Sequence, residues 1–251
     1  MKLGLEGKVV VITGGSKGIG RAICQGFLEE GAIVHFCGRD EKALFAAHEY
    51  FAALQEAPKT ARADGRKIDV TVPHEIDAWI NDIFEIEKRI DIVVSNVSSI
   101  SVTNDAAAWQ TAYQTDMMGT VALINSALPY LEKSKGSIVT ISSVSGRDVD
   151  FTAPSPYGAL KAALTHALAA KSIRANTVSP GNIYIADGVW GSIEKDNPEL
   201  FKSQMGKNPM GRMGKASEVA DAVVWVASER AGFVSGGNLV VDGALCNGVQ
   251  F

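Results

Sequence analysis

The feature that most constrains the fold is a repeated alternation of short apolar runs with helical patterns. Residues 8–12 form a continuous apolar run, typical of a strand buried on both faces, and a glycine-rich turn and a helical pattern follow it. The same alternation predicts strands at 8–12, 32–37, 66–70, 91–95, 137–142, 173–178 and 238–241, and helices at 21–30, 41–55, 74–87, 106–131, 157–170 and 217–227. The pattern predicts an α/β fold: a single-domain, Rossmann-type, doubly wound parallel sheet of about seven strands with helices on both faces.

Composition narrows the class of protein further. The 251 residues are 46% hydrophobic and no composition break divides them, so we expect one domain over residues 1–251. The net charge of −4 and the lack of a basic block argue against nucleic-acid binding. Three scattered cysteines (Cys24, Cys37 and Cys246) are typical of reduced thiols, and no metal site is expected. No signal-like or membrane-length apolar run is visible, so we expect no membrane association and a cytoplasmic location.

One long segment, from Pro180 to about Met213, fits neither pattern and is rich in glycine, proline and asparagine. Irregular segments of this length are often lids or binding loops, so we expect a mobile substrate flap at about 182–213. Its large apolar residues either line a substrate pocket or pack the flap onto the body of the protein; they are Trp190, Met205, Met210 and Met213.

The turn after the first strand predicts a dinucleotide-binding loop. Glycines between a strand and a helix let the backbone approach a phosphate closely, and the helix N-terminus attracts negative charge. The spacing here departs from the usual pattern, and a tight turn without a ligand is the alternative interpretation. The residues expected to bind the cofactor in this loop are Gly14, Ser16, Lys17, Gly18, Ile19 and Gly20.

The end of the second predicted strand indicates which cofactor binds. An NAD site usually has a carboxylate there, but this chain has Arg39 after the strand and Lys17 in the glycine loop. Two cations suit a 2′-phosphate, so we expect NADP(H) rather than NAD(H); solvated surface charges are the alternative. Asp69 and Val70 end the third predicted strand, where Asp69 either bonds the adenine amino group or caps a turn.

A second group of residues predicts acid–base chemistry. Tyr157 and Lys161 are spaced i and i+4, which puts both on one face of a helix. An ammonium beside a phenol favours the phenolate, and a nearby serine can bond an oxygen whose charge changes during reaction. Ser142 and Ser143 end the fifth predicted strand, at the sheet edge where such folds bind ligands.

Taken together, these motifs resemble the short-chain dehydrogenase/reductase family over nearly the whole chain. The chain looks closest to the bacterial 3-oxoacyl-carrier-protein reductase-like members. The resemblance implies that Tyr157 is the general acid/base, that Ser143 orients the substrate oxygen, and that Lys161 favours ionised Tyr157 and binds the nicotinamide ribose. It also implies that further positions contact the cofactor, namely Asn96, Pro180, Gly181 and Ile183.

Two positions in the catalytic region depart from the family pattern. Asp116 stands where the family usually has a helix asparagine that completes a proton relay to the lysine; we include Asp116 among the catalytic candidates. A carboxylate there still accepts a hydrogen bond, stabilises Lys161 as an ammonium and partly offsets its field on Tyr157. Ser98 replaces a glycine that passes close to the cofactor.

The sequence therefore supports an NADP(H)-dependent oxidoreductase that interconverts a carbonyl and a secondary alcohol in a small molecule. The alternative is an NADP(H)-binding protein with little or no catalysis, in a sensor or regulatory role. Asp116, Ser98 and a shortened helix after Lys161 motivate this alternative. The intact set of Ser143, Tyr157 and Lys161 argues against that alternative.

The family resemblance also implies a homo-oligomer, either a dimer or a tetramer. From Lys161 to Asn176 the chain is about seven residues shorter than the family usually is, a loss of about two helical turns. Because this helix packs against its copy in relatives, we predict a weakened or rearranged dimer interface. Sedimentation should show weakened or altered association that restoring two turns changes; an ordinary stable tetramer that is unaffected by the insertion would contradict the prediction.

Overall fold

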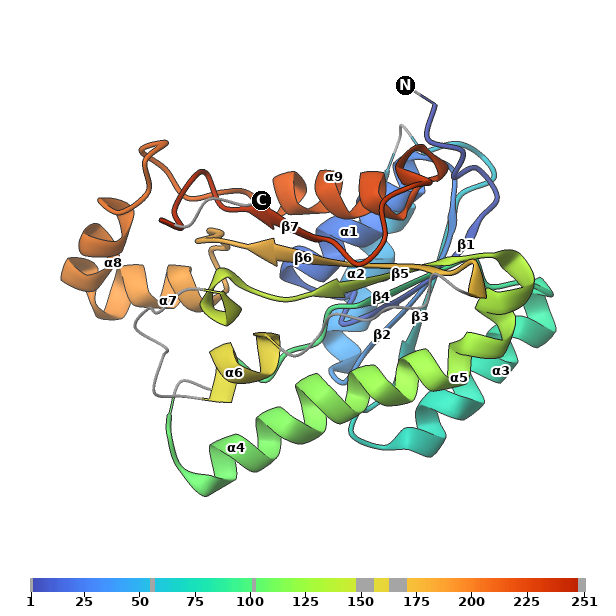
Figure 1. Cartoon of the computed structure of the whole chain (residues 1–251), viewed down its shortest axis with the longest axis horizontal. Coiled ribbons are helices and arrows are strands. Elements are labelled where there is room, and N and C mark those ends of the chain that lie inside the picture. Colours follow the sequence, from blue (N-terminus) through green and yellow to red (C-terminus); the bar gives the residue numbers. More distant parts are fainter. Residues whose placement is uncertain (1, 55–56, 101–102, 148–155, 163–170, 248–251) are drawn as a thin grey trace.

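A computed structural model describes residues 2–54, 57–100, 103–147, 156–162 and 171–247. Its strands form one seven-stranded parallel sheet in the order β3-β2-β1-β4-β5-β6-β7 (Figure 1). The strands are β1 (Val9–Thr13), β2 (Ile33–Gly38), β3 (Arg62–Lys67), β4 (Ile92–Ser95), β5 (Ser137–Ile141), β6 (Arg174–Pro180) and β7 (Asn238–Val241). The helices are α1 (Gly18–Glu29), α2 (Glu41–Ala52), α3 (Pro73–Glu87), α4 (Ala106–Ala112), α5 (Gly119–Ser134), α6 (Pro156–Ala162), α7 (Val189–Asp196), α8 (Pro198–Met205) and α9 (Ala216–Ala227).

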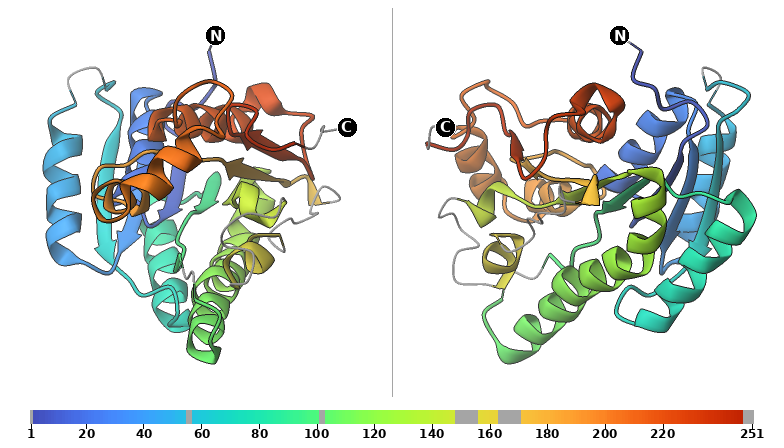
Figure 2. Two further views of the ribbon diagram at one scale, coloured as in Figure 1. Left: turned by 90° about the vertical axis from the view of Figure 1, so that its left-hand side faces the viewer. Right: turned by 45° about the vertical axis from the view of Figure 1, so that its right-hand side comes forward.

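Two apolar cores lie on opposite faces of the sheet. Successive side chains of a strand point to opposite faces, so Val10 and Ile12 of β1 join one core while Val9 and Val11 join the other. Helices α1, α2 and α9 supply the first core, and α3 and α5 supply the second. Figure 2 shows these helical layers around the sheet from two further directions. The predicted Rossmann-type fold with helices on both faces is confirmed.

The strand order places a crevice at the carboxyl end of β1. From β1 the chain first adds β2 and β3 on one side and then crosses over to β4 on the other side. The connections that leave β1 and β4 therefore go to opposite faces and leave a gap between them, which is where open α/β sheets bind ligands. The short helices α6, α7 and α8 gather at this same end of the sheet (Figure 1).

The third strand lies earlier in the sequence than its predicted position at 66–70. Arg62 pairs with Ile33 and Lys67 pairs with Gly38, so β3 ends before Ile68 and Val70, which are buried in the core beside α3. This edge strand carries mostly polar residues with exposed side chains, so it lacks the apolar run by which the other strands were recognised. The prediction for this strand was wrong because apolar residues that follow the strand were taken for the strand itself.

The single helix predicted at 106–131 consists of three consecutive helical segments. A π-helical turn, Tyr113–Met118, joins α4 to α5, and buries Thr115 and Asp116. Each π-turn inserts one residue into the helical repeat and thereby changes which side chains face inward, and such turns often occur at functional sites. The other predicted helix of interest, 157–170, is described only as far as α6; the remaining residues 163–170, and with them the expected interface, lie outside the described residues.

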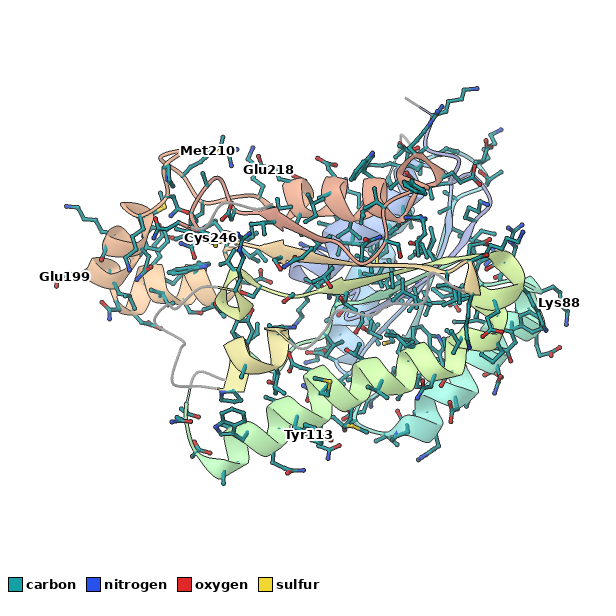
Figure 3. All side chains as sticks on the ribbon, viewed as in Figure 1. Lys88, Tyr113, Glu199, Met210, Glu218 and Cys246 are labelled. Carbon is teal, nitrogen blue, oxygen red and sulfur yellow. The ribbon has the colours of Figure 1, made fainter. Side chains whose placement is uncertain are left out.

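The segment predicted as an irregular flap contains two helices. Its two ends are held together, because Gly214 donates to Asn182 and receives a hydrogen bond from Tyr184, at 2.8 and 2.9 Å, and between them the chain forms α7 and α8. Figure 3 shows this part of the molecule at the left, with Glu199 of α8 at its outer end and Met210 above Cys246. The described helices include none long and apolar enough to cross a membrane.

Candidate active site

A cleft of about 560 Å³ opens at the carboxyl ends of the central strands. It gathers residues from seven separate stretches of the chain that were predicted to form the site. Those that line it are Gly14, Ser16, Lys17, Gly18, Ile19, Gly20, Arg39, Val70, Asn96, Ser143, Tyr157, Lys161, Pro180, Gly181 and Ile183. Two other candidates, Asp69 and Asp116, do not line this cleft: Asp69 borders the adjacent groove, and Asp116 lies buried behind Lys161.

A second pocket of similar size, about 580 Å³, lies at the opposite edge of the sheet. Several charged groups around it already have protein partners: Lys8 pairs with Glu229 at 2.9 Å, and Asp91 pairs with Arg89 at 2.6 Å. The Arg174 guanidinium donates hydrogen bonds to backbone carbonyl oxygens at the end of α9. Most of the chemistry-bearing residues predicted from the sequence line the first cleft, which we take as the site.

The glycine-rich loop is shaped by its glycines and by Asn96. Gly14 has a φ of 71°, a conformation that side chains with a Cβ rarely adopt, and an added Cβ on Gly20 would overlap the carbonyl oxygen of Gly14. Asn96 closes the loop from β4, because its side-chain amide donates to the carbonyl oxygens of Thr13 and Gly14 at 3.1 and 3.2 Å. The loop is thus fixed to the ends of two strands and holds its backbone close to α1.

The start of α1 fits the phosphates of a dinucleotide. Lys17 precedes the helix in an extended conformation and makes no side-chain cap, and the first turn contains no acidic residue. The amide groups of this turn and the positive end of the helix dipole are therefore available to an anion that enters the cleft. The donor-rich helix start and the glycine loop together have the form required to hold a nicotinamide dinucleotide.

The end of the cleft at Lys17 and Arg39, where the adenosine of a cofactor is expected, has an acidic residue close by that was not predicted. Lys17 and Arg39 both line the cleft, but the carboxylate of Asp40 lies 3.7 Å from the Lys17 ammonium. Asp40 caps α2 by accepting from the Ala43 amide at 3.0 Å, and this bond, with Lys17, holds the pKa of Asp40 below its usual range. The premise that no acid stands near these cations was therefore wrong, although Asp40 is not one of the described residues that line the cleft.

Asp69 lies beside the same end of the cleft. One of its oxygens accepts from both the amide and the hydroxyl of Thr71, at 2.9 and 2.8 Å, and the other lies 3.9 Å from Arg39. Partial burial opposes ionisation, but the Thr71 bonds and Arg39 outweigh it and hold the pKa of Asp69 below its usual range. Asp69 thus serves the turn after β3, which was the alternative role; adenine binding by Asp69 stays a prediction.

The catalytic candidates meet where α6 crosses the end of β5. The Lys161 ammonium lies 5.9 Å from the centre of the Tyr157 ring, as expected for residues one turn apart on a helix. Lys161 is 3% exposed and also donates to the carbonyl oxygen of Ile141 at 3.1 Å. The Ser142 hydroxyl donates to the Lys161 carbonyl oxygen at 2.6 Å and so joins α6 to the strand.

A buried ion pair lies directly behind this face of α6. One carboxylate oxygen of Asp116 lies 3.1 Å from the Lys161 ammonium, and both side chains are 2% exposed. The π-helical turn before α5 is what brings Asp116 to this position, and the Thr120 hydroxyl bonds the carbonyl oxygen of Asp116 at 2.7 Å. Ser98, the other departure from the family pattern, donates to the same carboxylate at 2.6 Å.

Ser143 rather than Ser142 presents its hydroxyl to the cleft. The Ser143 oxygen accepts from the Ser145 amide at 3.2 Å, so its own hydrogen is left for an oxygen atom in the cleft. The Ser142 hydroxyl hydrogen, by contrast, is used on the Lys161 carbonyl. Residues 148–155, which connect this serine to α6 in the sequence, lie outside the described part of the chain.

The far wall of the cleft comes from the end of β6 and the start of the flap. Pro180 ends the strand, and the Gly181 amide donates to the carbonyl oxygen of Val241 at 3.0 Å. The side-chain nitrogen of Asn182 is buried and has no hydrogen-bond partner among the described residues, which leaves a donor at this wall. An orphaned donor of this kind fits a site that takes a polar ligand.

The outer part of the cleft is apolar. Ile100, Val144, Val189 and Trp190 line it, and the Trp190 ring packs edge-on against Phe201 with centroids 6.4 Å apart. Trp190 therefore both lines the cleft and packs α7 onto α8. The three methionines do not line the cleft: Met213 is buried elsewhere, Met210 is 65% exposed, and Met205 belongs to α8.

Several residues of the site were not predicted from the sequence. They include Asp40, which lies in the turn after β2, Asn182 and Asp187, which lie in the segment after β6, and Thr115, which lies in the π-helical turn. Position after a predicted strand was the available signal for Asp40 and Asn182, whereas no local pattern indicated Thr115. Within the described residues no cluster of histidine, cysteine or acidic side chains could hold a metal ion.

Sequence comparisons place the whole chain among known proteins. A family model described as Enoyl-(Acyl carrier protein) reductase matches residues 14–245. The chain is 38% identical to the isoepoxydon dehydrogenase patN of Penicillium expansum, over 99% of this chain and 98% of that protein. It is 34% identical to the L-fucose dehydrogenase of Mus musculus, over 95% of this chain and 88% of that protein.

Solved structures give a similar result. A 7α-hydroxysteroid dehydrogenase, complexed with NADH and 7-oxo glycochenodeoxycholic acid, matches with a TM-score of 0.85 and 26% identity, covering 97% of this chain and 96% of that one. The L-sorbose reductase of Gluconobacter frateurii, complexed with NADPH and L-sorbose, matches with a TM-score of 0.85 and 28% identity, covering 99% of this chain and all of that one. Both cofactors thus occur among the structural neighbours.

The loop geometry makes Gly20→Ala a direct test of the cofactor site. The new methyl group would overlap the Gly14 carbonyl oxygen and push the loop away from α1. We expect the affinity for a nicotinamide dinucleotide to fall at least about ten-fold, measured by fluorescence titration with NADPH. Gly206→Ala is the matched control, because an added Cβ there meets its nearest atoms only at 3.5 Å. Unchanged affinity in a folded Gly20→Ala protein would contradict the assignment.

Proposed function

Because this chain belongs to the short-chain dehydrogenase/reductase family, we propose that it interconverts a carbonyl and a secondary alcohol with NADP(H), Tyr157 acting as the general acid/base. The observation that carries the proposal is that Tyr157, Lys161 and Ser143 line the same cleft as the glycine-rich loop. A phosphate-binding loop alone fits many functions. An acid–base group beside a buried ammonium, in the same cleft, specifically fits proton transfer coupled to a redox step.

The residues of the chain supply the proton transfer and the orientation. When bound, the nicotinamide cofactor supplies or accepts the hydride. In the reductive direction the Tyr157 hydroxyl donates its proton to the carbonyl oxygen of the substrate, and in the oxidative direction the phenolate takes it back. The Ser143 hydroxyl donates to the same oxygen, while Lys161 stabilises the phenolate electrostatically.

Two cations at the adenosine end support NADP(H) rather than NAD(H). Lys17 and Arg39 line the cleft, with side chains 60% and 69% exposed, so both are free to turn toward a phosphate. Asp40 partly offsets Lys17 but also accepts from the first turn of α2, which holds it toward that helix. Within the described part of the chain the charged partner of Arg39 is Asp69, at a distance of 3.9 Å, and Arg39 is therefore the residue on which the preference depends most.

The substrate is proposed only as a small carbonyl or alcohol compound with an apolar part. Ile100, Val189 and Trp190 provide an apolar wall beside the catalytic residues, and Ser145 and Asp187 provide polar groups at the same cleft. The names of the similar proteins refer to compounds as different as L-fucose, L-sorbose and a hydroxysteroid. They support the reaction class rather than one substrate.

Replacing Tyr157 with Phe tests the proposed reaction. The substitution removes only the hydroxyl group, so we expect turnover to fall by about 100- to 10,000-fold while NADPH affinity stays within about two-fold. NADPH oxidation is measured with a panel of ketones, β-keto esters and aldehydes. Tyr130→Phe, which removes an exposed hydroxyl bonded to Asn81, is the control. Undiminished turnover of the Tyr157 variant would refute the assignment.

The same panel separates this proposal from its alternative. If the wild-type protein binds NADPH but consumes it with no compound of a broad panel, the cofactor-binding role without catalysis becomes the better account. Running the panel with both NADPH and NADH also measures the cofactor preference.

Replacing Arg39 with Ala tests the cofactor preference. Loss of a charge-assisted bond to the 2′-phosphate should weaken NADPH binding roughly ten- to hundred-fold and leave NADH binding nearly unchanged. Titration of the protein with each cofactor measures both effects. Lys42→Ala, an equal loss of charge in the exposed first turn of α2, should change neither. An equal effect of Arg39→Ala on both cofactors would contradict the preference.

A further inference from the structure

The two catalytic-region departures from the family pattern are in direct contact with each other. Ser98 follows β4 and Asp116 lies in the π-helical turn, 18 residues later. The Ser98 hydroxyl donates to one carboxylate oxygen of Asp116 at 2.6 Å, a short distance typical of a charge-assisted hydrogen bond. Two separate changes that meet at one bond indicate a single arrangement rather than two unrelated substitutions.

The remaining contacts of Asp116 show why its side chain is a carboxylate. The Ser99 amide donates to its second oxygen at 2.9 Å, and the Lys161 ammonium lies 3.1 Å from its first oxygen. Three donors therefore converge on one side chain. An asparagine there would have to point its amide nitrogen at a donor, whereas an ionised carboxylate accepts at every position.

The burial of Asp116 and Lys161 determines how strongly their charges act on the site. Asp116 and Lys161 are both 2% exposed, and an unpaired charge at such a depth is costly. The opposite charges of the pair partly cancel at the distance of Tyr157, whose ring centre lies 5.9 Å from the ammonium. In this site the field of Lys161 on Tyr157 is thus partly compensated from behind.

We propose that Ser98 is a positioning residue that holds the Asp116 carboxylate against Lys161, so that a neutralised ammonium–carboxylate pair, rather than an ammonium alone, controls the ionisation of Tyr157. The inference rests on the proposed function of Tyr157 as the acid/base. It extends that function to the pH range over which the site works. Neither Ser98 nor Asp116 needs to touch the reacting atoms for this role.

Few other charged groups face this pair. Among the described residues of the elements packed on α6, Tyr113 of the π-helical turn is exposed, and Arg147 follows the short 3₁₀ turn after β5. Asp187 lines the same cleft from the start of the flap. Strands β4 and β5 and helix α4 contain no ionisable side chain. These flanking groups stay the same in every variant of the test.

The sign of the expected pH effect follows from the charges. Asp116→Asn removes the negative charge, which leaves the ammonium field on Tyr157 uncompensated, so the phenolate forms at lower pH. Ser98→Ala loosens the carboxylate and shifts the midpoint in the same direction by less. In the Asp116→Asn background, Ser98→Ala has no carboxylate to position and should cause no further shift.

The test is a double-mutant cycle of Ser98→Ala and Asp116→Asn with two readouts. The first is the pH profile of alcohol oxidation; the second is the ultraviolet absorbance of the phenolate, taken as the difference from the matching Tyr157→Phe protein. We expect both midpoints to fall by about one pH unit in Asp116→Asn, a ten-fold change in the ionised fraction, and by less in Ser98→Ala. Ser95→Ala, which removes a buried bond to Thr120 without touching the carboxylate, should leave both midpoints unchanged.

The outcomes separate this inference from the proposed function. Midpoints that rise or stay fixed in Asp116→Asn, or an equal Ser98→Ala shift in both backgrounds, overturn the inference. If no variant transfers hydride, the proposed function fails, yet the absorbance titration still decides whether the pair controls Tyr157. Thermal unfolding of each variant establishes that it is folded, and Ser98→Thr, which retains the hydroxyl, should restore the wild-type midpoint.

Discussion

The parallel alignment of the strands is the constraint on which the site depends. Because β1, β4, β5 and β6 run in one direction, their carboxyl ends deliver the glycine loop, Asn96, Ser143 and Pro180 to a single edge of the sheet. The hydrogen-bond register fixes their relative heights, and the two apolar cores hold the sheet between its helices. The chemistry is therefore assembled from distant parts of the sequence by backbone pairing rather than by contacts among the functional side chains.

The ion pair behind α6 buries two charged groups at this edge of the sheet, which is energetically costly. Removing one partner from such a pair leaves an uncompensated charge. The Ser98 hydroxyl, the Ser99 amide and the Ile141 carbonyl stabilise the pair by hydrogen bonds to its two side chains. The π-helical turn is part of the same arrangement, because it faces Asp116 inward toward α6. Backbone geometry, hydrogen bonding and charge thus act together on the two residues that differ from the family pattern.

Much of the fold and of the candidate site could be predicted from the sequence. The physical reasons for this also explain which predictions were wrong. Buried strands such as β1 have apolar side chains on both faces and are visible as runs, whereas the edge strand β3 is polar and was misplaced by four residues at its start. The i, i+4 spacing put Tyr157 and Lys161 on one face, since that depends only on local helix geometry. The Ser98–Asp116 bond, the π-helical turn and the approach of Asp40 to Lys17 depend on tertiary placement, which no local pattern encodes.

We propose that this cleft couples hydride transfer from a nicotinamide cofactor to proton transfer by Tyr157. The most direct measurement is reduction of a responsive ketone with NADPH deuterated at C4 of the nicotinamide, followed by mass and NMR analysis of the alcohol. We expect deuterium on the carbinol carbon of the alcohol. An alcohol whose carbinol hydrogen comes from water, or NADPH oxidation without formation of any alcohol, would contradict the proposal.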